Sequence, residues 1–394
     1  MSIQTSARIQ RVKPSPTLAV TALANQLRAE GRDVIGLAAG EPDFDTPEHI
    51  KRAAIKAIND GMTKYTAVDG TAELKQAIIN KFKRDNGLDY EADQILVSVG
   101  GKQAIYNLAQ ALLNPGDEVI IPAPYWVSYP DIVKLADAEP VIVSGDMSQA
   151  FKITAEQLQN AITDRTRMFV INSPSNPSGK AYTRDELKSL ADVLLQYPDI
   201  TILTDDIYEH IVWTDEGFNN ILNVCPELKD RTLVINGVSK AYSMTGWRIG
   251  YSGGPAEIIK GMKKVQSQST SNPCSIAQAA AREALDGDQS FLAKMCHVFR
   301  NRHDYVYNTL NKMDGVECLP SDGTFYSFPS FHAVIERMEG IEDDVQLAQL
   351  FLEKAEVALV PGTAFGLPGH LRLSFATDMI SMEKALERIQ QAIA

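Results

Sequence analysis

The sequence of 394 residues contains only four cysteines, and none of them forms a motif. No two make a Cys-x-x-Cys pair, and no histidine stands at zinc-ligand spacing beside them. So few cysteines exclude a disulfide-stapled scaffold and indicate reduced thiols, which are typical of the cytoplasm. We therefore expect a cytoplasmic protein with no metal site, in which the cysteines serve as small buried hydrophobes. They are Cys225, Cys274, Cys296 and Cys318.

Several familiar signatures are missing as well. No apolar run reaches the roughly 18 residues of a membrane span, so we expect no membrane contact. Gly-x-Gly does not occur, and Gly101-Lys102 lacks the flanking residues of a phosphate-binding P-loop. The zinc-protease, serine-hydrolase and calcium-loop motifs are absent too. The net charge of −12 disfavours a nucleic-acid-binding protein, which would carry surplus lysine and arginine.

Acidic residues are missing from positions 1–29, and the first one is Glu30. Four basic residues fall in the same stretch, which superficially resembles a transit peptide. However, Leu18, Leu23 and Leu27 lie near helical spacing, and the segment runs on without a break. We therefore expect it to belong to the fold. The basic residues are Arg8, Arg11, Lys13 and Arg28.

What is present is an alternation of helix and strand patterns. Thr46-Pro47 predicts a helix start, and Thr154 and Thr183 begin capping boxes. Short apolar runs separate the helical segments. They cover 95–99, 118–121, 141–143, 168–172, 201–204, 233–236 and 248–252. Strands separated by helices favour parallel pairing. We predict an α/β fold with a mostly parallel central sheet sandwiched by helices, followed after about residue 290 by a smaller α+β domain.

Polar residues come directly after these strands. They are Gly100-Gly101-Lys102, Asn176, Asp205, Ser239-Lys240 and, eight residues further on, Arg248. Ligands of open α/β sheets bind at the carboxyl ends of the strands, so these groups should meet at one rim. A helix N-terminus with Ser239 and Arg248 suits a phosphate. A lysine and a buried aspartate suit pyridoxal 5′-phosphate, whose aldehyde forms an imine with lysine and whose ring nitrogen pairs with the aspartate.

The segment around Lys240 also resembles a known motif. Residues 237–251 (GVSKAYSMTGWRIGY) are similar to the lysine motif of the class I (fold type I) aminotransferases. Further segments resemble the same family over nearly the whole chain. They are 39–47, 64–65, 124–129, 172–179, 205–209 and 372–374. Gly100–Ala104 is most similar to the bacterial and plastid-type aspartate aminotransferases. The resemblance implies a fold type I aminotransferase that uses pyridoxal phosphate.

The resemblance also implies roles for single residues at the cofactor. Lys240 would be the catalytic residue, holding the cofactor and moving a proton. Asp205 would pair with the ring nitrogen, and Tyr208 and Asn176 would bond its hydroxyl. Tyr65 resembles a tyrosine that reaches the phosphate of the neighbouring subunit, which implies a homodimer with shared active sites. The remaining cofactor-binding residues would be Gly100, Gly101, Lys102, Trp126, Ser239 and Arg248.

Substrate binding is implied in the same way. Arg372 would clamp the substrate α-carboxylate, a bidentate task that suits arginine. Gly40 would contact the same end of the substrate through its backbone. Lys102 would reach the distal carboxylate of a dicarboxylic substrate, unless it contributes only backbone and charge. The other substrate-binding residues would be Lys13, Thr17, Trp126 and Asn176.

These resemblances imply transfer of the amino group from L-aspartate to 2-oxoglutarate by a ping-pong mechanism. The substrates and partners would be small amino acids and keto acids. Prephenate, aromatic or broad-range transamination stays open, as does a lyase on the same scaffold. A cofactor-sensing regulator would need a DNA-binding domain, for which the chain has no spare segment. We expect an N-terminal arm at 1–13, a small domain from 14–45 and 290–394, and a large domain at 46–289.

Overall fold

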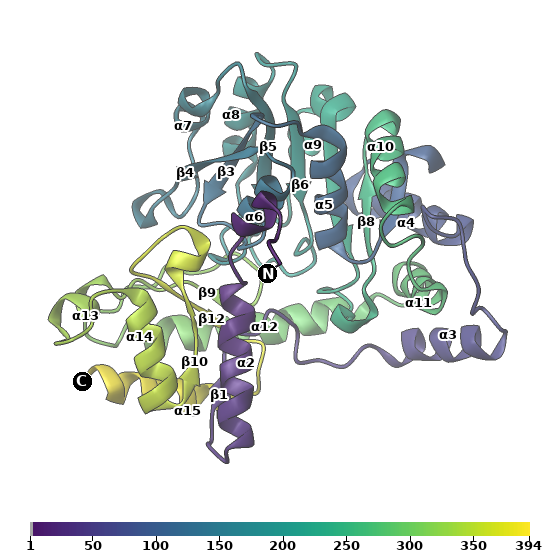
Figure 1. Ribbon diagram of the computed structural model, residues 1–394. Helices are drawn as coiled ribbons and strands as arrows, with labels where there is room; N and C mark the ends of the chain where they lie inside the picture. Colours follow the sequence, from purple (N-terminus) through teal and green to yellow (C-terminus); the bar gives the residue numbers. More distant parts are fainter. Residues whose placement is uncertain (1–2) are drawn as a thin grey trace.

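The computed structural model describes residues 3–394 and centres on a seven-stranded sheet (Figure 1). The strands are β2 (Ile95–Ser98), β3 (Glu118–Ala123), β4 (Glu139–Ser144), β5 (Thr166–Asn172), β6 (Thr201–Asp205), β7 (Thr232–Gly237) and β8 (Gly250–Gly253). Their order is β2-β8-β7-β6-β5-β3-β4. Only β8 is antiparallel to its neighbours, β2 and β7. The predicted α/β fold with a mostly parallel sheet is therefore confirmed.

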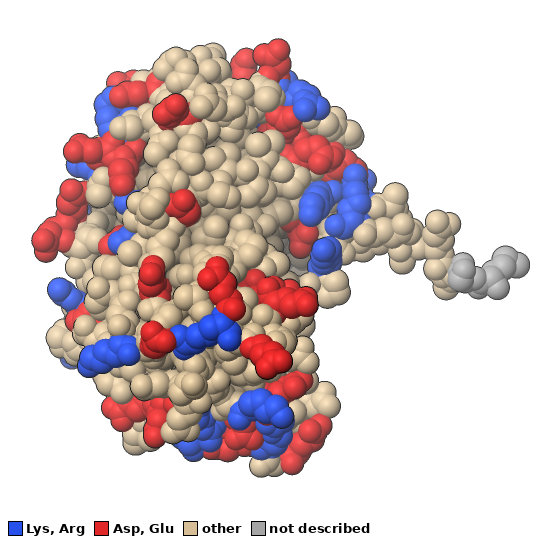
Figure 2. All heavy atoms as spheres, turned by 90° about the vertical axis from the view of Figure 1, so that its left-hand side faces the viewer, with Lys and Arg blue, Asp and Glu red and all other residues tan. Residues whose placement is uncertain are grey.

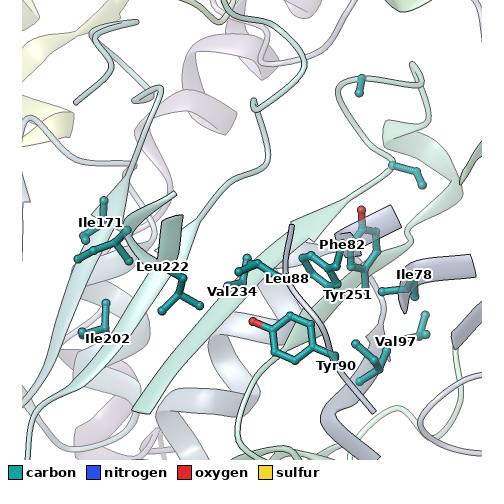
Figure 3. Packing of buried hydrophobic residues seen from close by; sticks show 14 of the residues in the cluster. Ile78, Phe82, Leu88, Tyr90, Val97, Ile171, Ile202, Leu222, Val234 and Tyr251 are labelled. Atoms are coloured by element: carbon teal, nitrogen blue, oxygen red, sulfur yellow. The ribbon is translucent and has the colours of Figure 1, made fainter. Parts of the chain in front are cut away.

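Both faces of this sheet are buried. Along β5, Phe169 and Ile171 join one hydrophobic cluster, whereas Met168 and Val170 join another on the opposite face. Figure 3 shows the first cluster, in which Ile171, Ile202 and Val234 from neighbouring strands lie along one face of the sheet. Burial on both sides is why the strands read as continuous apolar runs rather than as alternating patterns.

Helices cover the two faces and connect the strands. They are α3 (Glu48–Asn59), α4 (Ala72–Asn86), α5 (Gly101–Leu112), α6 (Tyr129–Leu135), α7 (Ala155–Ala161), α8 (Arg184–Leu194), α9 (Ile221–Val224), α10 (Ala256–Ser267) and α11 (Ser275–Asp286). Thr154 and Thr183 form the predicted capping boxes of α7 and α8. The start of α3 differs slightly from the prediction, because Pro47 is the cap and Glu48 the first helical residue.

The strand predicted over 248–252 is present, but its predicted start was wrong for Arg248 and Ile249. Arg248 precedes this strand and has a φ of 55°, in the left-handed region, after a short 3₁₀ turn at Thr245–Trp247. The strand begins at Gly250 and runs against its neighbours. An antiparallel strand starts where the parallel strands end. Arg248 therefore still lies at the rim where the other polar residues emerge.

A second group of elements lies below the large sheet in Figure 1. Its strands are β1 (Ile35–Gly36), β9 (Tyr326–Ser327), β10 (Val357–Ala358), β11 (Val360–Pro361) and β12 (Leu371–Ser374). Its helices are α2 (Pro16–Ala29), α12 (Ser290–Leu310), α13 (His332–Arg337), α14 (Asp344–Leu350) and α15 (Met379–Ile393). β1 pairs in parallel with β10, and β11, β12 and β9 form an antiparallel sheet. Residues near both ends of the chain thus build one α+β region.

The N-terminal segment is partly helical, as expected. α1 (Ala7–Gln10) contacts α6, and Arg8 and Arg11 pair with Asp137. The first described residues project from the body of the molecule (Figure 2). α2 contacts β1, β10 and β11, but Leu18 is 68% exposed. The leucine spacing therefore indicated the helix correctly, although Leu18 does not pack in the core.

Two further expectations can be compared with the structure. Within residues 3–394, no helix combines the length and apolar character that crossing a membrane requires. The cysteines are all free, but only Cys225 and Cys318 are buried, whereas Cys274 is exposed. The expectation of four buried cysteines was wrong for Cys274, which lies outside the core as the N-cap of α11, and for Cys296, which is only half-buried.

Candidate active site

A cavity of about 450 Å³ lies at the carboxyl ends of the parallel strands, where the α+β region meets the large sheet. This volume falls in the usual range for small-molecule sites. Twelve of the fifteen predicted site residues line it: Thr17, Gly40, Gly101, Lys102, Trp126, Asn176, Asp205, Tyr208, Ser239, Lys240, Arg248 and Arg372. The predicted convergence on one rim therefore occurs.

Lys240 follows β7, and its side chain reaches into the cavity. Its Nζ donates a hydrogen bond to the backbone carbonyl of Gly40 and lies 5.9 Å from the centroid of the Tyr208 ring. Burial, aided by the positive charge of Arg372, lowers the pKa of Lys240 from 10.5 to about 8. A lysine with such a pKa gives up its proton near neutral pH far more readily than a surface lysine, as a nucleophile or base requires.

Asp205 is the last residue of β6 and the buried carboxylate of the cavity. Its Oδ2 accepts a 2.6 Å hydrogen bond from the hydroxyl of Tyr129 at the start of α6. Burial raises the pKa of Asp205 from 3.8 to about 6, and the bond from Tyr129 opposes this shift. Its Oδ1 also accepts a 3.4 Å bond from the backbone N–H of Ile207. A buried carboxylate with no cation bonded to it is suited to receive a cationic ring N–H.

The start of α5 offers a place for a phosphate. Gly100 is the N-cap of this 12-residue helix, with a φ of 82°. A Cβ at Gly100 would lie 2.5 Å from Nη2 of Arg248, and one at Gly250 would lie 2.3 Å from the amide nitrogen of Gly101. Glycines therefore let the guanidinium and the helix N-terminus come together. Free N–H groups, a guanidinium and the nearby Ser239 form a donor set that suits a phosphate dianion.

Arg372 is a buried cation of β12. It donates to the side-chain oxygen of Asn176 at 2.9 Å and to the carbonyl of Ala38 at 2.6 Å. Within the described part of the chain, its Nε has no hydrogen-bond partner. Burial lowers the pKa of Arg372. Both recorded partners are neutral oxygens, so an incoming carboxylate would supply the missing negative charge.

Lys102 is a second cation in the cavity. Its Nζ lies 5.0 Å from the centroid of the Trp126 ring. Desolvation and the positive charge of Arg248 both lower the pKa of Lys102. Thr17 of α2 also lines the cavity, and its hydroxyl is buried without a partner among residues 3–394. The cavity thus offers a cation and a hydroxyl to a second polar group of a ligand.

Three predicted site residues do not line the cavity. Gly100 borders it through its contact with Arg248. Lys13 precedes the lining residue Ser15 but is itself exposed. Tyr65 is 92% exposed and lies outside the cavity of its own chain.

Three further residues of the cavity were missed by the sequence analysis. Tyr129 contacts Asp205, Tyr326 contacts Tyr208, and Glu41 accepts a bond from Thr245. Tyr129 stands three residues after Trp126 in the segment 124–129. This helical spacing was the only feature of the sequence that could have placed Tyr129 near the site. Tyr326 lies among phenylalanines and therefore looked like an ordinary core residue.

The fold and the cavity together are those of an α/β enzyme with a lysine and a buried aspartate at the carboxyl ends of its strands. A family model for "Aminotransferase class I and II" matches residues 32–389, and the chain belongs to this family. An aspartate/prephenate aminotransferase from Nitrosomonas europaea is 58% identical, with 99% of each chain covered.

Solved structures agree with this assignment. The aspartate aminotransferase from Rhizobium meliloti is 50% identical with a TM-score of 0.96, covering 100% of this chain and 99% of its own. The aspartate aminotransferase from Thermus thermophilus, solved with maleate, is 43% identical with a TM-score of 0.93. It covers 99% of this chain and 100% of its own. The chain is thus an aminotransferase of fold type I.

Proposed function

We propose that this aminotransferase uses pyridoxal 5′-phosphate to transfer the amino group of L-aspartate to 2-oxoglutarate, giving oxaloacetate and L-glutamate. The observation that carries the proposal is one cavity with four groups in it. They are the lysine Lys240, the buried carboxylate Asp205, and two cations, Arg372 and Lys102, which have no anionic partner among residues 3–394. The first pair suits the cofactor and the second pair suits a dicarboxylate.

The residues present fit pyridoxal phosphate at each of its polar groups. The guanidinium of Arg248 can approach Gly100 and Gly101 only because Gly100 has no side chain. A Cβ at Gly100 would clash with the guanidinium. Asp205 accepts one hydrogen bond from Tyr129 and can accept another from a ring nitrogen. Trp126 lines the same cavity and offers a flat face for stacking. Tyr208, Asn176 and Ser239 complete the proposed cofactor-binding set.

When bound, pyridoxal phosphate supplies an electron sink for the pair released at the substrate's Cα. The protein's own part is positioning and proton transfer. Lys240 Nζ would hold the cofactor between reactions and, as the free amine during the reaction, would move the proton from the substrate's Cα to C4′ of the cofactor. Its lowered pKa of about 8 suits this exchange. Asp205 keeps the ring nitrogen protonated by staying ionised beside it. Arg372 fixes the α-carboxylate and so orients the Cα–H bond.

The substrate class follows from the two cations. Arg372 is the buried clamp for the α-carboxylate, with Gly40 beside it, and Lys102 is placed for the distal carboxylate. Thr17, whose buried hydroxyl has no partner among residues 3–394, offers a donor to the same group, and Lys13 would add a positive charge from the N-terminal segment. The names of the relatives and the maleate in one of the solved structures agree with a dicarboxylate. Prephenate is also a dicarboxylate, so aspartate/prephenate transamination is the second candidate.

The assembly and location are part of the same proposal. Exposed apolar side chains gather on α3 and the residues after it: Ile55, Ile58, Met62 and Tyr65. Such a patch marks an interaction surface, and we infer a homodimer in which Tyr65 reaches the partner's phosphate site. Free cysteines fit a reducing cytoplasm. We also propose an N-terminal arm at 1–13, of which residues 1 and 2 lie outside the described part, a small domain at 14–45 and 290–394, and a large domain at 46–289. The pairing of β1 with β10 supports the joining of the two parts of the small domain.

The test combines a spectrum with a substrate panel. Purified protein given the cofactor should absorb in the near-visible. Lys240→Ala should lose the absorbance band that depends on the covalent bond between Lys240 and the cofactor. If the parent chain shows no such band, the cofactor proposal fails. The panel then offers aspartate, aromatic amino acids and glutamate as donors, with oxaloacetate, 2-oxoglutarate and prephenate as acceptors. Aspartate with 2-oxoglutarate should be fastest, and release of ammonia without a keto acid would instead indicate a lyase.

A further inference from the structure

Tyr326 lies against three parts of the cavity that come from separate stretches of the chain: Arg372, Tyr208 and Gly40. It opens β9 and pairs with Ser374 of β12, the strand that carries Arg372. Its hydroxyl lies 3.0 Å from the hydroxyl of Tyr208. The guanidinium carbon of Arg372 lies 4.4 Å from the centroid of its ring. A Cβ at Gly40 would lie 2.8 Å from the same hydroxyl, so the hydroxyl rests against a backbone that has no side chain.

We propose that Tyr326 is a positioning residue that couples occupation of Arg372 by a substrate carboxylate to the hydrogen bond that Tyr208 gives the cofactor. This inference rests on the proposed function, because it assumes a cofactor hydroxyl at Tyr208 and a carboxylate at Arg372. It adds a second connection to the direct bond between Arg372 and Asn176.

The direction of hydrogen bonding follows from the number of protons. Each phenol has one proton, and the two hydroxyls share one bond. If Tyr208 donates its proton to the cofactor hydroxyl, its oxygen must accept from Tyr326. A hydroxyl that accepts a bond becomes a better donor, so the chain Tyr326–Tyr208–cofactor strengthens along its length.

Arg372 controls the first member of this chain. A guanidinium over the face of a phenol ring makes the hydroxyl a stronger donor, because the positive charge favours loss of the proton. A substrate carboxylate at Arg372 neutralises that charge, so Tyr326 and then Tyr208 donate less strongly. The other charged groups facing the two tyrosines are Glu41, Asp205 and Lys240.

The measurement is the pH midpoint of the cofactor's visible absorbance in the loaded protein. Tyr208 lowers that midpoint by stabilising negative charge on the cofactor hydroxyl, and Tyr326 assists it. Tyr326→Phe keeps the ring and its contact with Arg372 but removes the donor. We expect the midpoint to rise by about 0.3 to 1 pH unit, less than in Tyr208→Phe. A purely structural role for Tyr326 would leave the midpoint unchanged.

The double variant makes the test specific. Because Tyr326 acts through Tyr208, the double variant should have the same midpoint as Tyr208→Phe alone. Additive shifts would overturn the proposal. The matched control is Tyr90→Phe, since Tyr90 is buried and, within residues 3–394, its hydroxyl has no partner. This control should leave the midpoint of the parent protein unchanged.

A second measurement uses maleate, a dicarboxylate without an amino group. Saturating maleate should raise the midpoint of the parent, and the rise should be smaller in Tyr208→Phe. Equal rises would overturn the coupling even if Tyr326→Phe failed to fold. If the parent showed no visible band at all, the proposed function would fail instead, so the two failures can be told apart.

Discussion

The hydroxyl of Tyr129 donates a 2.6 Å hydrogen bond to Oδ2 of Asp205, and both side chains are buried. Tyr129 is the first residue of α6, which follows β3, and Asp205 is the last residue of β6. The hydrogen bond therefore links a helix after one strand of the sheet to the end of another strand. Burial alone would push the carboxyl toward its neutral form, and this bond opposes that shift. The phenol thus helps to keep Asp205 ionised for its proposed partner.

We predict that Tyr129→Phe weakens cofactor binding. Without the bond, the pKa of Asp205 rises above about 6, and less of the carboxylate is ionised at neutral pH. Loss of a hydrogen bond to a charged group costs roughly 1.5–3 kcal/mol, so we expect the Kd for pyridoxal phosphate to increase about tenfold or more. Titration of the absorbance band measures it. Tyr90→Phe is the control, and an unchanged Kd in Tyr129→Phe would show that Asp205 does not depend on Tyr129.

Asp205→Asn should change the stability of the cofactor-free protein in a pH-dependent way. The pKa of Asp205 is raised from 3.8 to about 6, so the folded state binds its proton more tightly than the unfolded state. This carboxyl therefore favours folding below about pH 4, and the advantage is lost as the pH rises through 6. Relative to the parent, the variant should gain up to about 3 kcal/mol of unfolding free energy between pH 4 and pH 7.

Urea unfolding at pH 4, 5.5 and 7 measures this gain. Asp199→Asn, at an exposed position, is the matched Asp-to-Asn control. A constant difference between Asp205→Asn and the parent at all three pH values would mean that Asp205 titrates normally in the folded protein.

The sequence could predict the rim of the sheet but not every contact made there. Asp205 ends the buried strand β6 and Lys240 comes three residues after β7, so local pattern and the rule for parallel sheets placed them correctly. Tyr326 could not be placed, because its role depends on the pairing of β9 with β12, which lie far apart in sequence. Arg248 was assigned to a strand because no local pattern signals a left-handed backbone at arginine.

Lys102→Ala should distinguish acidic from aromatic substrates. The change removes a cation that faces the cavity and, in the proposal, bonds the distal carboxylate. A charge-assisted bond contributes roughly 1.5–3 kcal/mol, so kcat/KM for aspartate should fall about 10- to 100-fold. Aromatic donors should change much less. Steady-state kinetics with both donors gives the ratio, and Lys188→Ala, at an exposed position of α8, is the control. Equal losses for both donors would exclude the distal-carboxylate role.

Lys81→Met should destabilise the protein strongly, because Lys81 is the cation of a buried polar cluster. Its ammonium pairs with Glu209, one residue after Tyr208, and donates to Asn86 at 2.7 Å. Glu209 also accepts a 2.8 Å bond from Asn236, which lies shortly before Lys240 in the chain. Asp85, Glu209 and His210 are close enough together to suggest a metal site, but the Lys81 ammonium already supplies a positive charge there.

Without that ammonium, the carboxylate of Glu209 is left buried without its cation, which costs about 3–5 kcal/mol. Urea unfolding at fixed protein concentration should show this loss for Lys81→Met. Lys56→Met removes an exposed pair with Asp60 and should cost at most about 1 kcal/mol. The double change Lys81→Met with Glu209→Gln removes both charges and should recover part of the loss. If the double variant is no more stable than Lys81→Met alone, the cost comes from lost packing around Lys81 rather than from an unpaired charge.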